Sequence, residues 1–240
     1  MRWFLVSLAI TGCANAGPGN SIIGGLNDAS VNDGRDLPEL DAPVIDASPR
    51  QVTLDQNTSS AIKGGNSFAC VPTAGQEDHT PANSYYRVFT LADSNVTSTL
   101  HVSEVVFGVE FASAATGGMQ PAKLRLGSYA GTPAGRTIDP AQITTITTVD
   151  IQINDTLAGD RVTVPIGADI PANTNLVVEL DIPENLTAFN RFYIGSNGAG
   201  ETKPGYWGAP SCDLDPPQAF AAMLDLPNEV DILMTVSGSM

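Results

Sequence analysis

Residues 104 to 111 decide the fold prediction, and they read Glu104-Val105-Val106-Phe107-Gly108-Val109-Glu110-Phe111. From Val105 to Phe111, an apolar side chain stands at every second position of this stretch. Successive side chains of a β-strand point to opposite faces of its sheet, so this period of two gives the strand one continuous apolar face. The stretch therefore predicts a half-buried strand, which is typical of antiparallel sheets.

The same alternation recurs along the rest of the chain, separated by turns rich in Gly, Pro, Asn and Asp. It is present in residues 87–91, 124–126, 149–153, 162–166, 176–182, 192–194 and 230–236. Strands of this kind without intervening helices are typical of sandwiches and jelly rolls. We expect an all-β fold, namely an antiparallel, jelly-roll-like β-sandwich with about eight strands.

One segment near the end of the chain has a helical pattern. Asp215 is placed to cap it, Pro216 or Pro217 suits a first helical turn, and the residues 218–224 that follow favour helix. Pro227 would end the segment. The sequence therefore predicts one short helix in an otherwise all-β domain.

The charge balance limits the partners that we expect. The chain has 11 basic and 26 acidic residues among 240, a formal net charge of −15. Such a surface repels phosphate backbones and anionic lipids, so we expect no nucleic-acid partner. After the first dozen residues, no apolar stretch approaches the roughly 20 residues that span a bilayer. Membrane attachment would therefore need a covalent anchor.

The N-terminus has the features of such an anchor. Met1-Arg2 precedes a short apolar run, and the run ends at Ile10-Thr11-Gly12-Cys13. This ending resembles the lipobox of bacterial lipoproteins, which implies a signal peptide over residues 1–12 and acylation of Cys13, the new first residue. Ala14, where Asp would mark inner-membrane retention in enteric bacteria, favours the outer membrane of the cell envelope. The alternative is an ordinary signal peptide, cleaved after Ala14 or Ala16.

Residues 13–67 predict a lipid-anchored, flexible acidic linker, because they lack a lasting apolar period. Residues 52–54 are compatible with a short first strand. We expect the β-sandwich domain to cover residues 68–240. The two remaining cysteines, Cys70 and Cys212, would form a disulfide between its two ends in an oxidising compartment. A pair of free or metal-binding cysteines is the alternative.

Most sequence patterns of catalytic sites are missing. The chain has no Gly-x-Ser-x-Gly elbow, no phosphate-binding loop and no zinc-protease motif. The two histidines, His79 and His101, have no partners that the sequence identifies. We predict no metal site and no cofactor, although Asp213 with Asp215, or Glu77 with Asp78, offers oxygen ligands suited to calcium. The chain is therefore predicted not to be an enzyme.

Aromatic residues give the one candidate ligand site. Tyr193, Tyr206 and Trp207 fall in one region of the sequence, and Tyr85 lies in an early strand. Tyr and Trp rings stack on the apolar faces of sugars, so these four residues are a candidate carbohydrate platform. The alternative is that the rings pack in the core or at its rim, with their polar tips wet.

Three segments resemble a known type of module. They are residues 83–93, residues 192–197, and residues 206–212, which read Tyr-Trp-Gly-Ala-Pro-Ser-Cys. Together they resemble a β-sandwich accessory module of secreted bacterial proteins, which implies a surface role without a catalytic residue. The resulting hypothesis is a non-enzymatic envelope lipoprotein that binds a surface glycan or protein. The alternatives are a structural envelope protein without a dedicated ligand and an unrecognised hydrolase.

Overall fold

A computed structural model describes residues 48–71, 79–114, 117–133, 135–184, 189–223 and 229–240. The predicted signal peptide, Cys13 and most of the predicted linker lie outside these residues. Within them the chain is all-β, and its only helical segments are 3-10 turns of three or four residues. No helix in this part of the chain is long and apolar enough to cross a membrane.

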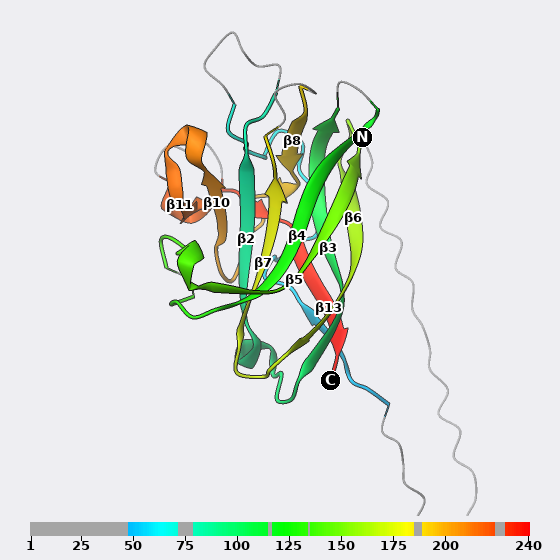
Figure 1. Cartoon of the computed structure of the whole chain (residues 1–240), viewed down its shortest axis with the longest axis vertical. Helices are drawn as coiled ribbons and strands as arrows, with labels where there is room; N and C mark the ends of the chain where they lie inside the picture. Colours follow the sequence, from blue (N-terminus) through cyan, green and yellow to red (C-terminus); the bar gives the residue numbers. More distant parts are fainter. Residues whose placement is uncertain (1–47, 72–78, 115–116, 134, 185–188, 224–228) are drawn as a thin grey trace, which may run out of the picture. The chain divides into compact units, whose positions relative to one another are not determined.

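The strands of the described residues form two larger antiparallel sheets and one small one. The five-stranded sheet contains β1 (Gln51–Leu54), β13 (Met234–Ser239), β3 (Leu100–Ser113), β6 (Asp160–Ile170) and β8 (Arg191–Ile194). The six-stranded sheet has the order β11 (Leu214–Ala219), β10 (Gly205–Ala209), β2 (Asn83–Thr90), β7 (Asn175–Ile182), β4 (Met119–Tyr129) and β5 (Ile143–Asn154). The third sheet pairs β12 (Asp231–Ile232) with β9 (Ser196–Asn197). Figure 1 shows β10, β2, β7 and β4 side by side. These thirteen strands exceed the predicted number of about eight, mainly because several are very short.

Apolar side chains at every second strand position bring residues of both larger sheets into one hydrophobic core. Val105, Phe107 and Val109 of β3 are fully buried in it, as the period of two predicts. Leu124 of β4 and Leu180 of β7 belong to the same hydrophobic cluster. The five-stranded and six-stranded sheets therefore share a hydrophobic core.

Glycine is required at the point where the strand paired with β3 changes from β13 to β8. Along one edge it pairs with β13 as far as Phe107 and then with β8 from Val109. At the junction the amide of Gly108 donates to the carbonyl of Leu233, and the carbonyl of Gly108 accepts from the amide of Gly195. A Cβ atom on Gly195 would lie 2.7 Å from the backbone of Gly108, so only glycine allows this approach.

The folded unit begins earlier than the sequence predicts. β1 lies inside the predicted linker and pairs in register with β13, from Gln51 opposite Ser239 to Leu54 opposite Val236. Val52 and Leu54 are buried in the core. The described residues 48–67 therefore belong to the domain, and the predicted boundary at residue 68 comes too late.

The helix prediction for residues 218–224 is wrong for its described residues, 218–223. Gln218 and Ala219 end strand β11, and only Phe220–Ala222 form a 3-10 turn. Arg136 accepts a backbone hydrogen bond from Ala219, and the amide of Ile138 donates to the carbonyl of Pro217. Pairing with residues 136–138 satisfies this backbone as a strand, which overrides its local preference for helix.

Cys70 and Cys212 form the disulfide that the sequence predicts. They are separated by 142 residues, and their Cα atoms lie 5.9 Å apart. The bond joins the segment before β2 to the 3-10 turn between β10 and β11. It therefore links the segment before the first strand of the six-stranded sheet in sequence, β2, to the segment before its last strand, β11.

Candidate functional site

The four aromatic residues of the predicted carbohydrate platform do not form one surface. Trp207 lies opposite Tyr85 in the β10–β2 pair, on the core face of the sheet. Tyr206 belongs to a second hydrophobic cluster that includes Tyr86 and Val88. Tyr193 lies in β8, in the other larger sheet, with its ring 6.0 Å from that of Phe111.

Burial excludes three of these rings from stacking on a sugar. Trp207 is 7% exposed, and Tyr85 and Tyr206 are buried more deeply. The Trp207 ring stacks on Phe220 with 5.8 Å between ring centroids, and its Nε1 donates to Oδ1 of Asn83 at 2.8 Å. The carbohydrate platform is therefore a wrong prediction for these three residues, since their faces and polar atoms are used within the protein. Only Tyr193 is half-buried.

A different site surrounds Arg87, which sequence reasoning did not identify. Arg87 stands on the same face of β2 as Tyr85 and Phe89, because every second residue of a strand shares a face. Its side chain is fully buried, and its Nη2 lies 2.8 Å from Oε2 of Glu201. A buried ion pair is costly to desolvate, so it needs further hydrogen bonds to be tolerated.

Surrounding groups supply most of those hydrogen bonds. Nη1 of Arg87 donates to the carbonyl of Lys203 at 2.8 Å and to Oε1 of Gln56 at 3.4 Å. Nη2 donates to Oδ1 of Asn57 and to the carbonyl of Ile232. Among the described residues, Nε of Arg87 lacks a hydrogen-bond partner, and Oε2 of Glu201 has none beyond its ion pair with Arg87. Gln56 and Asn57, which lie in the predicted linker, thus accept hydrogen bonds from the buried Arg87.

Burial shifts both charges of the pair toward neutrality. It raises the pKa of Glu201, and the neighbouring carboxylate of Asp231 raises it further, against the opposing attraction of Arg87. Burial also lowers the pKa of Arg87, although Glu201 opposes that shift. The same physical cause therefore dominates for both partners, which indicates that their attraction does not fully offset their desolvation.

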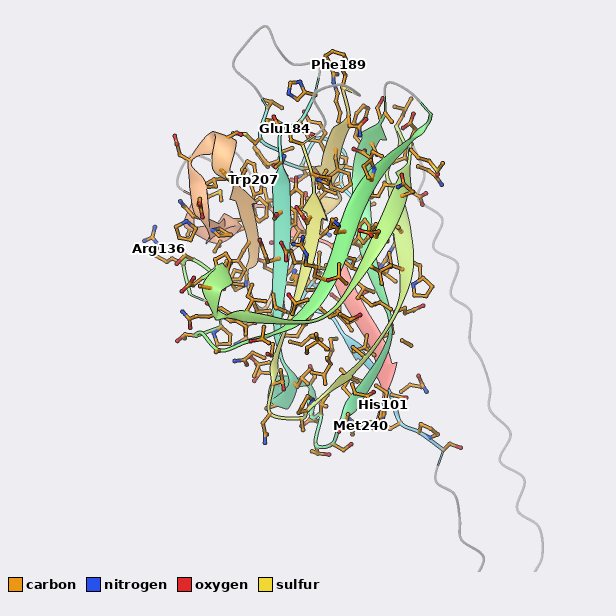
Figure 2. All side chains as sticks on the ribbon, viewed as in Figure 1. His101, Arg136, Glu184, Phe189, Trp207 and Met240 are labelled. Atoms are coloured by element: carbon orange, nitrogen blue, oxygen red, sulfur yellow. A yellow bond between two sulfur atoms is a disulfide. The ribbon has the colours of Figure 1, made fainter. Side chains whose placement is uncertain are left out.

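Glu201 also lines two adjoining cavities. The first is about 420 Å³, and its lining includes Glu201, Glu229 and Asp231 together with the apolar residues Phe220, Met223 and Val230. The second is about 360 Å³ and adds Arg136 and Lys203. Figure 2 shows Arg136 projecting away from the ribbon on this side of the domain. We refer to the first cavity as the carboxylate pocket.

Two carboxylates of the carboxylate pocket are held by neighbouring groups, and the third is exposed. Asp231 is buried, and its Oδ2 accepts the amide of Gly200 at 2.8 Å. Glu201 is held by Arg87 and by the amide of Gly205, which donates to Oε1 at 3.2 Å. Glu229 is exposed. The pocket can thus accept hydrogen bonds from a hydroxyl or cationic group at carboxylates held in place before binding.

The remaining ionisable residues do not join this pocket. His101 pairs with Asp169 at 2.7 Å on an exposed part of the surface, at the end of the domain opposite Phe189 (Figure 2). The nearby hydroxyl of Ser103 donates to the carbonyl of Ser237 instead. His79 lies against the ring of Phe189. The described residues contain no group of three or more His, Cys, Asp or Glu side chains placed to hold a metal ion, and Glu77 and Asp78 lie outside them.

Comparison with known proteins adds no relative to this description: no protein-family model, no curated protein and no solved structure matches the chain.

Proposed function

We propose that this chain is a non-enzymatic lipoprotein of the bacterial cell envelope, anchored in the outer membrane through acylated Cys13. Its domain is an antiparallel β-sandwich that binds a surface protein or a glycan. The observation that carries the binding role is the carboxylate pocket, with Glu201 held by the buried Arg87. Neither a cofactor nor a metal ion enters the proposal.

The cysteines support export. Disulfides persist in oxidising compartments outside the cytoplasm, and Cys70 and Cys212 are bonded to each other. That pairing accounts for every cysteine after Cys13. A cysteine at the end of a short apolar leader, without a thiol partner in the domain, fits acylation.

The shared core supports the sandwich. Two antiparallel sheets that enclose one hydrophobic cluster are the defining arrangement of this architecture. Phe107 of the five-stranded sheet and Leu124 of the six-stranded sheet are fully buried members of that cluster. Connections of a sandwich run over its surface, where loops are free to form binding sites.

The chemistry of the carboxylate pocket defines its ligand as a hydrogen-bond donor. Glu201, Glu229 and Asp231 offer acceptors to sugar hydroxyls, to amino sugars or to a basic side chain of a protein. The buried aromatic rings at Tyr85 and Trp207 leave no stacking surface of their own, so recognition of a glycan would depend on its hydroxyl groups.

A panel of immobilised glycans and basic peptides tests the binding role. We expect Glu229→Gln to weaken binding by about tenfold or more, because charge-assisted hydrogen bonds contribute roughly 1.5–3 kcal/mol. Glu184→Gln is the matched control, since Glu184 is also exposed but lies outside the pocket (Figure 2). Binding that is equally strong in both variants would remove the pocket from the proposal.

The anchor has a separate test. Mass spectrometry of the mature wild-type protein should find Cys13 as the first residue, carrying acyl chains, and Cys13→Ser should release the protein from membranes. An unmodified thiol at position 13 would contradict the anchor without affecting the binding experiment.

A structural envelope protein is the second candidate, favoured by the burial of Trp207 and Tyr206. Aromatic rings that fill the core do not require a ligand. This candidate predicts that no glycan or peptide of the panel binds, and that deletion of the protein alters the envelope itself.

A further inference from the structure

Strand β5 forms one free edge of the six-stranded sheet. Among the described residues it pairs only with β4, so the backbone groups on its other side face away from the sheet. The opposite edge differs, because Thr137 bridges to Gln218 of β11. An unpaired edge offers a row of amide and carbonyl groups to another strand.

The first seven residues of β5 lack two of the usual protections of an edge strand, which are charge and proline, although a third, a β-bulge, is present at Ile146. Residues 143–149 read Ile-Thr-Thr-Ile-Thr-Thr-Val, without charge and without proline. Threonine, isoleucine and valine are the residue types that favour strands. Ile146 is 41% exposed, and Thr144, Thr145 and Thr148 are exposed as well.

The free edge of β6 is protected by comparison. It carries Pro165 and the charged residues Asp160, Arg161 and Asp169. Proline removes a backbone donor, and charges disfavour the approach of a second strand. The two long edge strands of the domain therefore differ in whether they can accept a partner.

The sequence of residues 143–149 also matches itself in reverse. In an antiparallel pair of two copies with a two-fold axis at Ile146, Ile143 would face Val149, and threonines would face threonines. Such an interface uses the same patch on both copies, as two-fold dimers do. The chain carries a net charge of −15, yet this pairing brings no charged residue of the segment against another.

We propose that β5 pairs antiparallel with β5 of a second copy of this chain, about a two-fold axis at Ile146. Main-chain hydrogen bonds supply the attraction, as in other cases of strand addition. The register of β4 and β5 shifts between Thr145 and Thr147, so Ile146 is the extra residue of a β-bulge. The bulge lies at the axis and leaves three residues on either side of it, 143–145 and 147–149, to form the pairs.

The test uses the full chain purified from membranes or, if no anchor is present, from solution. Light scattering, corrected for bound detergent, should give twice the mass of one chain. Ile146→Lys places two like charges against each other at the axis, so we expect the dimer dissociation constant to rise by tenfold or more. Thr163→Lys, an exposed position on the protected edge of β6, is the matched control and should leave the dimer unchanged.

A second measurement tests the proposed register of the β5–β5 pair. Ile146→Cys should give a disulfide-linked dimer under mild oxidation, whereas Thr163→Cys should not. The dimer should also strengthen with salt, because salt screens the repulsion between two acidic chains. A wild-type protein that stays monomeric at every concentration, or an equal effect of Ile146→Lys and Thr163→Lys, would overturn the proposal. Neither outcome bears on the carboxylate pocket or the anchor.

Discussion

Two neighbouring parts of the inner face of β2 are stabilised in opposite ways. Around Tyr85 the stabilising groups are aromatic rings and a disulfide: Trp207 lies opposite Tyr85 in the adjacent strand, and Cys70, which is bonded to Cys212, donates its amide to Oδ1 of Asn83. Two residues further along the same face, Arg87 forms a buried ion pair with Glu201.

The difference between them concerns what each interaction costs. Burying apolar rings lowers the free energy of the folded state, and a disulfide lowers the conformational entropy of the unfolded chain. A buried ion pair first loses the hydration of two charges. We therefore expect the aromatic part to stabilise the domain, and the ion pair to matter mainly when one partner is missing.

Removing the disulfide should have the largest effect. A bridge between residues 142 apart is expected to contribute about 5 kcal/mol, because it restricts the entropy of the unfolded chain. The double variant Cys70→Ser and Cys212→Ser should lose roughly that much, measured by urea unfolding. Cys13→Ser is the control and should leave the free energy of unfolding unchanged. A loss below about 1 kcal/mol would show that loop closure contributes little here.

Breaking the ion pair from one side should have the next largest effect. Arg87→Met leaves Glu201 buried without its partner, and Glu201→Leu does the same to Arg87. Each change should cost about 3–5 kcal/mol in urea unfolding. The reason is the uncompensated charge that remains, rather than the attraction that is lost.

The double variant separates these two reasons. With both charges replaced, no buried charge is left unpaired, so Arg87→Met with Glu201→Leu should be at least as stable as either single variant and within about 1 kcal/mol of the wild type. Additive losses in the double variant would contradict the argument, since additivity would mean that Arg87 and Glu201 each contribute to stability independently of the other.

The strands were predictable from the sequence because alternation is a local property. The period of two in residues 104–111 is the same pattern that buries Val105, Phe107 and Val109. The helix over residues 218–224 failed for the opposite reason. Its local preferences for helix are real, but the backbone of Ala219 finds its partner at Arg136, and that pairing is not a local property.

The candidate site was not predictable for a similar reason. Arg87 and Glu201 are far apart in sequence, and neither belongs to a motif. The aromatic residues were noticed because of their type, yet type does not tell which face of a strand a residue occupies. Trp207 and Tyr206 are adjacent in sequence, and the alternation of β10 sends them into different hydrophobic clusters. One sign was readable: an arginine between Tyr85 and Phe89 on one strand face.

The smallest effect expected is on the pH dependence of stability. Burial, together with Asp231, raises the pKa of Glu201 above its ordinary value of 4.5. The folded state therefore holds the Glu201 proton more firmly than the unfolded state does. The stability from this group is fully present below pH 4.5 and is lost as the pH rises through the raised pKa. In urea unfolding, the stability of the wild type relative to Glu201→Gln should decline over that window.

Arg87→Met sharpens this experiment, because the charge of Arg87 opposes the other influences on Glu201. Without that charge the pKa of Glu201 should rise further, so the decline in stability should extend to higher pH than in the wild type. If the pH dependence of Arg87→Met instead matched that of the wild type, the attraction between the two charges would be too weak to influence Glu201. In that case the stability contributed by Glu201 would not depend on Arg87, and the proposed contrast between the ion pair and the aromatic part of β2 would fail.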